Sequence, residues 1–174
     1  MLARKFNSIM HFVNENWASE VLGIPINPHK GPDLINDNMV VEVKFTIIRP
    51  RKYNYISWRV LDYQLEYGNG KTAYWALGTY AMDRMISEIG TPDLEGLEKM
   101  VTHRVLTIVQ WDWMRQFKIY RETGETPISK WDNSLAFAKQ SLLPPEKKRY
   151  KVPKGEVIFT EGTNPEDFRI KQAY

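Results

Sequence analysis

The segment from Leu34 to Ile48 constrains the fold more than any other part of the sequence. Apolar residues flank Asn36-Asp37-Asn38, three residues of types that favour turns, and the run after them is rich in β-branched side chains. This pattern predicts a β-hairpin. If residues 37 and 38 form a two-residue loop, residue 34 pairs with residue 41 and residue 33 lies opposite residue 42.

That register places Asp33 directly opposite Glu42, with Cβ atoms about 4.5–5.5 Å apart. Two carboxylates at that separation repel each other unless a cation lies between them. The hairpin therefore predicts a cation site.

Side chains alternate between the two faces of a strand, so Val41, Val43 and Phe45 are expected on one face. Glu42 and Lys44 share the other, which gives the strand a dry face and a reactive face. The alternative interpretation is an exposed ion pair on a half-solvated strand. That alternative leaves the neighbouring basic residues and the preceding Gly-Pro-Asp sequence without an explanation.

Composition limits the chemistry available to these groups. The chain has 174 residues, enough for one domain, and no cysteine, which excludes disulfides and thiolate zinc sites. Its three histidines do not form an HxxxH zinc motif. A bound metal is thus expected to have oxygen ligands, which favours magnesium, manganese or calcium. With no signal peptide and no apolar run of about 18 residues, we expect a cytoplasmic protein without a membrane partner.

Basic residues are concentrated in two runs, although the net charge is only +3. The stretch from Lys44 to Arg59 contains five basic residues and no acidic one, and residues 147–151 form the second run. Both contain tyrosines, a composition suited to phosphate contact beside a stacking surface. The alternative for either run is a solvated face.

The other predicted elements alternate between helix and strand. A helix is predicted from about Ala3 to Leu22, ended by Gly23, because its apolar residues recur every three or four positions. Further helices are predicted over Tyr55–Tyr67 and Trp131–Leu143, and strands over Thr72–Tyr80, Arg104–Trp113 and Val157–Thr160. These elements indicate an α/β protein.

Pro32-Asp33 followed by Glu42-Val43-Lys44 resembles the motif of the PD-(D/E)XK nuclease superfamily, which includes restriction endonucleases and archaeal and viral Holliday-junction resolvases. The resemblance implies a restriction endonuclease-like core, with a mixed central sheet flanked by helices in the order α-β-β-β-α-β. It covers about residues 3–80, and residues 81–174 would elaborate a single nuclease domain spanning 1–174.

The resemblance also implies roles for these residues. Asp33 and Glu42 would bind Mg²⁺, with Mn²⁺ as a possible substitute, together with the backbone carbonyl of Val43. Lys44 would orient or help to deprotonate the attacking water. Because Lys44 neighbours two carboxylates, electrostatic positioning is favoured over general-base catalysis.

Many members of the superfamily add a catalytic glutamate from the first helix. Glu15 is the candidate here, because the sequence around it resembles the spacing of that helix. Glu20 competes with it, since Glu20 falls on the same helical face as Val13 and Trp17. The alternative for both is a surface position.

Candidate nucleic-acid contacts are polar residues near the motif or in the basic runs: Lys30, Arg51, Lys52, Gln64 and Lys148. Gln64 is equally compatible with a solvent-facing position. Five tryptophans are expected in the core rather than as stacking platforms: Trp58, Trp75, Trp111, Trp113 and Trp131.

The resemblance implies a Mg²⁺-dependent endonuclease that hydrolyses DNA phosphodiester bonds. Structure-selective cleavage is favoured over sequence-specific, restriction-type cleavage, because no base-reading motif is recognisable. A homodimer is expected, since cutting two strands needs two active sites. Two alternatives stay open: an RNA-directed or single-strand exonuclease, and a non-catalytic nucleic-acid-binding protein on the same scaffold.

Overall fold

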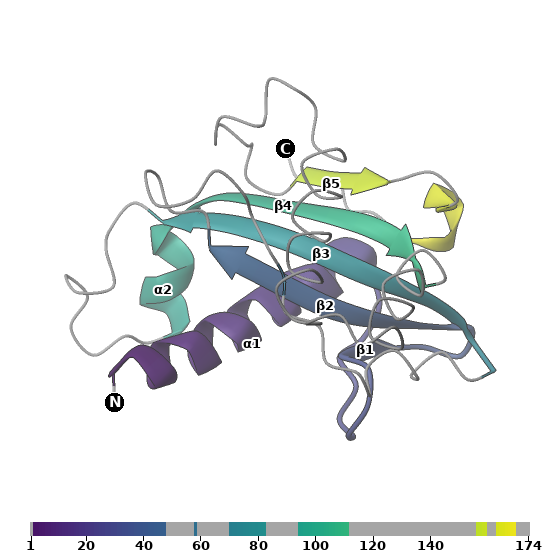
Figure 1. Ribbon diagram of the computed structural model, residues 1–174, viewed down its shortest axis with the longest axis horizontal. Helices are drawn as coiled ribbons and strands as arrows, with labels where there is room; N and C mark the ends of the chain where they lie inside the picture. The colour runs from purple at the N-terminus through teal and green to yellow at the C-terminus, as the bar shows by residue number, and fades with distance from the viewer. Residues whose placement is uncertain are drawn as a thin grey trace, which may run out of the picture.

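A five-stranded mixed β-sheet forms the centre of the molecule in the computed structural model (Figure 1), which describes residues 2–47, 58, 70–82, 94–111, 156–159 and 163–169. The strands are β1 (Leu34–Ile35), β2 (Met39–Ile47), β3 (Thr72–Met82), β4 (Val101–Gln110) and β5 (Glu156–Phe159). They lie side by side in chain order, with β1/β2 and β3/β4 antiparallel and β2/β3 and β4/β5 parallel. The predicted α/β class with a mixed sheet is confirmed.

Helix α1 (Leu2–Leu22) confirms the first predicted helix and ends where glycine was expected to end it. Gly23 has a φ of 67°, and its N–H donates to the carbonyl of Ser19 at 2.9 Å. A β-carbon at this position would lie 2.8 Å from the Cβ of Arg169. Backbone conformation and space therefore both favour glycine here.

The hairpin has the predicted register, with Leu34 opposite Val41 and Ile35 opposite Val40. The Asn36 side-chain carbonyl closes the turn by accepting hydrogen bonds from the backbone N–H groups of Asn38 and Met39, at 3.0 and 2.9 Å. An asparagine side chain stabilises a turn in this way when its oxygen bonds backbone two or three residues ahead. The sequence Asn36-Asp37-Asn38 thus determines how β1 and β2 pair.

One face of the sheet packs against α1 and carries the main core. Val41 and Val43 of β2 lie in a buried cluster with Ala18 and Leu22 of α1. Phe45 extends this face over Gly78, where a β-carbon would lie 2.2 Å from the ring, so β3 needs glycine at this position. The prediction that Val41, Val43 and Phe45 share an apolar face is confirmed.

The opposite face of β2 is also buried, which corrects the expectation of a dry face and a reactive face. Glu42 is 1% exposed, and its neighbour on β3 is Trp75, which is fully buried. Trp75 stacks on Trp111 with ring centroids 4.4 Å apart. These indoles and Trp58 confirm the prediction of core tryptophans, whereas residues 113 and 131 lie outside the described residues.

A short helix, α2 (Leu94–Met100), was not predicted and lies on the same side of the sheet as α1 (Figure 1). Arg104 of β4 joins the layers: it is fully buried, forms two 2.7 Å hydrogen bonds with Glu98 of α2, and donates to Asn14 of α1 at 3.0 Å. A buried arginine that is hydrogen-bonded in this way holds two helices and a strand in one arrangement.

The other predicted helices and strands can be compared with the structure only in part. β4 begins three residues before the predicted strand, and β5 coincides with the predicted last strand over residues 157–159. Of the helix predicted over residues 55–67 the structure describes only Trp58, and the helix predicted over residues 131–143 lies outside the described residues. Among the helices in the described part of the chain, none has the length and apolar character needed to cross a bilayer.

Candidate active site

The loop before β1 is built to hold Asp33. Asn27 fixes it from two sides: its N–H donates to the Asp33 carbonyl at 2.8 Å, and its side-chain amide donates to the Pro32 carbonyl at 2.9 Å. Gly31 has a φ of 144°, which L-residues with a side chain rarely adopt. The Gly-Pro-Asp sequence thus has a structural reason, since it turns the chain into β1 with Asp33 at its entrance.

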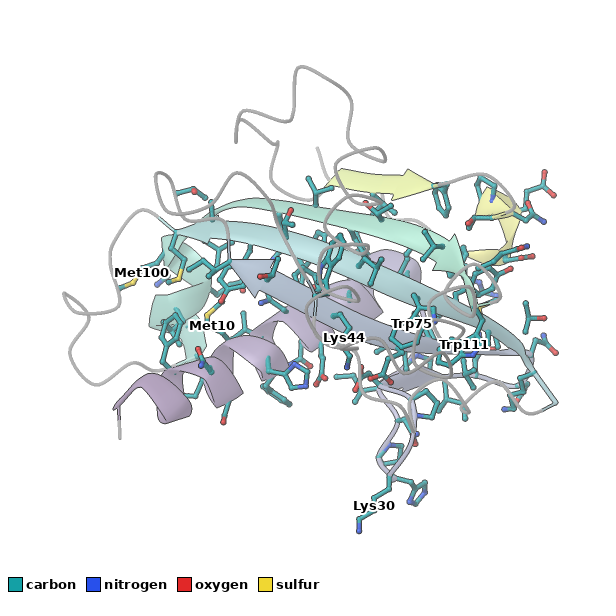
Figure 2. The ribbon with its side chains drawn as sticks, viewed as in Figure 1. Met10, Lys30, Lys44, Trp75, Met100 and Trp111 are labelled. Atoms are coloured by element: carbon teal, nitrogen blue, oxygen red, sulfur yellow. The ribbon has the colours of Figure 1, made fainter. Side chains whose placement is uncertain are left out.

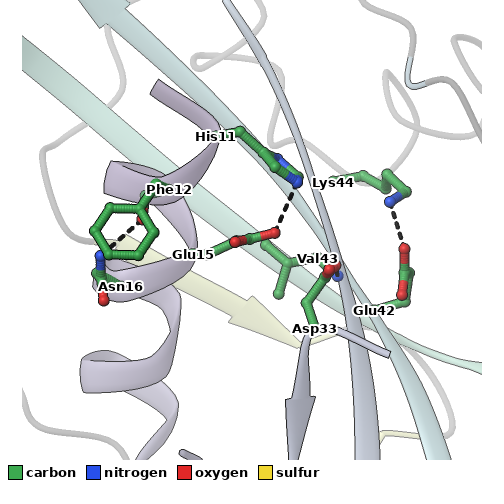
Figure 3. Close-up of polar contacts among 8 residues, drawn as sticks. All are labelled: His11, Phe12, Glu15, Asn16, Asp33, Glu42, Val43 and Lys44. Carbon is green, nitrogen blue, oxygen red and sulfur yellow. Dashed lines mark hydrogen bonds and ion pairs between the residues drawn. The ribbon is translucent and has the colours of Figure 1, made fainter. Parts of the chain in front are cut away.

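The carboxylate of Asp33 is bound to the backbone of the neighbouring strand (Figure 3). Its Oδ2 accepts a hydrogen bond from the N–H of Val43 at 2.7 Å. Because β1 begins only at Leu34, this side chain extends the contacts between the two strands by one position. Asp33 is therefore held beside the Glu42-Val43-Lys44 segment, as the predicted register requires.

Glu42 and Lys44 form an ion pair on the far side of β2 from α1 (Figure 3). The side chains are 1% and 14% exposed, respectively. Glu42 is therefore enclosed by protein, whereas the Lys44 side chain keeps some exposure to solvent.

Helix α1 contributes Glu15 and His11 to the same region (Figure 3). Nε2 of His11 lies 2.8 Å from Oε1 of Glu15, one helical turn along the helix. One ligand atom from each of His11, Glu15 and Asp33 lies within 4.8 Å of the others. Glu20 is exposed and instead lines a separate groove of about 380 Å³ beside Phe12 and α2. Of the two glutamates considered, Glu15 is the one beside Asp33.

Burial and like charge disfavour ionisation in this cluster. Burial, followed by the charge of Glu42, raises the pKa of Asp33 from 3.8 to about 7, although Lys44 acts in the opposite direction. Burial also raises the pKa of Glu42, again against the effect of Lys44. Glu15 adds a third carboxylate whose charge acts on both. A divalent cation would stabilise such like-charged oxygen donors in a partly buried site. Among the described residues, the ligand atoms that lie within 4.8 Å of one another belong to His11, Glu15 and Asp33, and Glu42 is not in this group.

The raised pKa of Asp33 predicts a stability that depends on pH. Between about pH 4 and 7 the folded protein keeps a proton that the unfolded chain has released. In EDTA, the free energy of unfolding should therefore fall as pH rises through this window. At 1.36 kcal/mol per pKa unit, Asp33 contributes at most about 4 kcal/mol to the fall.

Urea unfolding of the wild type and of Asp33→Asn between pH 4 and 8 measures this effect. The variant keeps a carbonyl oxygen for Val43 but lacks the titrating group, so its fall should be smaller. Asp37→Asn, an exposed position in the same hairpin, is the matched control and should behave like the wild type. Parallel curves for Asp33→Asn and the wild type would refute the raised pKa.

Of the five predicted nucleic-acid contacts, only Lys30 lies in the described part of the chain. Lys30 is exposed at the tip of the loop that leads to Asp33, and it points away from the sheet (Figure 2). Arg51, Lys52, Gln64 and Lys148 lie outside the described residues. For Val43, the described contact with Asp33 uses its N–H rather than its carbonyl.

His11 is the residue that the sequence interpretation missed. The available signal was its spacing, because His11 and Glu15 are four positions apart in a strongly predicted helix and must share a face. Only the hairpin, however, places Asp33 beside that face.

No protein-family model, curated protein or solved structure matches this chain. A functional assignment therefore depends on the geometry of the cluster and on the sequence itself.

Proposed function

We propose that this protein is a nuclease of the PD-(D/E)XK type that uses a divalent cation to hydrolyse DNA phosphodiester bonds. The observation that carries the proposal is the position of Asp33, whose carboxylate is bound to Val43, between the two residues of the Glu42–Lys44 ion pair. An isolated surface ion pair needs no third charged group. Here a dedicated loop brings an additional carboxylate to the pair and holds it there.

Asp33 and Glu42 are the residues that would hold the cation, with Glu15 in reach and the carbonyl of Val43 as the backbone ligand expected for such enzymes. A bound divalent cation lowers the pKa of water and neutralises charge on phosphoryl oxygens. The raised pKa values of Asp33 and Glu42 support this assignment, because burial and neighbouring like charges disfavour both carboxylates, and a cation would offset this. Mg²⁺ is the proposed ion, with Mn²⁺ as a substitute.

Lys44 is the proposed phosphate-contacting residue. Glu42 fixes the position of the ammonium group, and the Lys44 side chain is 14% exposed, against 1% for that of Glu42. A fixed, partly desolvated cation stabilises negative charge that develops on a phosphate more strongly than a mobile one. We assign Lys44 to electrostatic positioning of phosphate and water.

The substrate part of the proposal rests on the sequence. Two basic runs with tyrosines support a nucleic-acid substrate, and the lack of a base-reading motif supports structure-selective over sequence-specific cleavage. Lys30, exposed at the tip of the loop that leads to Asp33 (Figure 2), is available for a phosphate contact away from the cluster. A homodimer would supply two sites for paired cuts.

The proposal predicts cleavage that requires a divalent cation. Purified protein should be incubated with supercoiled plasmid, linear duplex, a four-way junction and single strands, in Mg²⁺, Mn²⁺ or EDTA. We expect cuts in the junction with either metal and none in EDTA. A discrete fragment pattern on linear duplex would instead support restriction-type cleavage. If the protein bound these nucleic acids but cleaved none of them, it would be a nucleic-acid-binding module and not a nuclease.

A further inference from the structure

An imidazole lies at the open side of the carboxylate cluster. The side chain of His11 is 55% exposed, whereas that of Glu15 beside it is 14% exposed. His11 and Glu15 alone would form an ordinary pair one turn apart on a helix. The carboxylate of Asp33, however, arrives at the same pair from another element and is fixed there by the N–H of Val43.

The three donor groups are close enough to share one ion. One nitrogen and two carboxylate oxygens lie within 4.8 Å of one another. Ligands bound to one ion at about 2.0–2.2 Å are at most about 4.4 Å apart, so small side-chain rotations bring all three into range. The exposure of His11 leaves room for such a rotation and for water ligands.

We propose that His11, Glu15 and Asp33 form a mixed nitrogen and oxygen site that selects Mn²⁺ over Mg²⁺. This inference deepens the proposed function and rests on it, because Asp33 is a ligand in both, and it makes Mn²⁺, the substitute named there, the ion that binds more tightly. Mg²⁺ prefers oxygen ligands in near-ideal octahedral geometry, whereas imidazole favours first-row transition ions. Among those ions, Mn²⁺ is the one that shares with Mg²⁺ a preference for carboxylate and water ligands.

If His11 is a metal ligand, its removal should change the affinities for Mn²⁺ and Mg²⁺ differently, whereas removal of an ordinary surface residue should change neither. Removing the imidazole deletes a ligand for Mn²⁺ but no ligand for Mg²⁺. It also leaves Glu15 without its hydrogen-bonded partner, so the negative potential at the cluster rises. Loss of His11 should therefore lower the affinity for Mn²⁺ while the affinity for Mg²⁺ holds or increases.

The test measures metal binding directly, without nucleic acid. Mn²⁺ binding is followed by the loss of the electron paramagnetic resonance signal of free Mn²⁺, and Mg²⁺ binding by calorimetry. Wild type, His11→Ala and His29→Ala are compared, the last being an exposed histidine in the loop before Asp33. We expect His11→Ala to lose about 10–100-fold in Mn²⁺ affinity, a range seen even for residues that only support a ligand. His29→Ala should match the wild type.

A second measurement tests whether the Mn²⁺ ion is bound by the imidazole nitrogen of His11. Pulsed resonance spectra of the Mn²⁺ complex should show coupling to ¹⁴N in the wild type and none in His11→Ala. Failure of the wild type to bind Mn²⁺, or an unchanged ratio of Mn²⁺ to Mg²⁺ affinity in His11→Ala, would overturn the inference even if the protein cleaves DNA. Conversely, His11-dependent binding in a protein that cleaves nothing would support the metal site and refute the nuclease.

Discussion

Asp33→Asn is expected to abolish DNA cleavage while the protein stays folded and, without metal at pH 8, becomes more stable. The substitution removes a charged metal ligand but keeps an oxygen that can accept the hydrogen bond from Val43. Loss of one preorganised group that stabilises a transition state lowers kcat by about 10²–10³-fold, and loss of a metal ligand should cost more. The gain in stability follows from removing one of the mutually repelling carboxylates.

Plasmid cleavage at saturating Mg²⁺ and urea unfolding in EDTA measure the two effects. Glu42→Gln should lose cleavage in the same way, because Glu42 is the other proposed ligand. Asp37→Asn changes an exposed carboxylate four positions away and should cleave like the wild type. Wild-type cleavage by Asp33→Asn would show that the site is misassigned.

Lys44→Ala is expected to lose several orders of magnitude in cleavage rate while it still binds the cation. The ammonium group of Lys44 is a competing positive charge that lowers the pKa of both Glu42 and Asp33. Its removal should leave more negative potential for a cation to neutralise. Metal affinity should therefore hold or rise as the rate falls, which separates Lys44 from the ligands.

Single-turnover cleavage and calorimetric titration with Mg²⁺ test this separation. Lys99→Ala is the matched control, because Lys99 also pairs with a glutamate, at 2.7 Å, but on the exposed surface of α2. It should change neither rate nor affinity. If the Mg²⁺ affinity of Lys44→Ala collapsed, Lys44 would be a structural partner of Glu42 and not a catalytic residue.

The hairpin and its register were predictable because their determinants are local. Asn36 specifies the turn with its own side chain, and the alternation of Val41 and Val43 specifies which residues face α1. Pairing across a two-residue loop then places Asp33 beside Glu42 without further information. The helical period of α1 likewise placed Glu15 and its neighbours on known faces.

Burial of the Glu42 face was not predictable, because it depends on residues far along the chain. Trp75 and Trp111 close that face, and no pattern within β2 indicates that they will. The short helix α2 was missed for a similar reason: its seven residues are too few for a clear helical period, and Leu97 is its one buried residue. His11 was missed because its place in the cluster depends on Asp33 lying beside α1.

All of the site residues, from His11 to Lys44, are synthesised before β3, the strand that pairs with β2 and brings Trp75 against Glu42. At about 5–20 residues per second, the ribosome needs several seconds to reach the end of β3. Until β3 pairs with β2, Trp75 does not cover Glu42, so burial of this carboxylate is completed only at that step. Removing a carboxylate from water is costly unless it is paired. The cost of enclosing Glu42 therefore arises when β3 pairs, and the Lys44 ammonium group, already present on the same strand, offsets it.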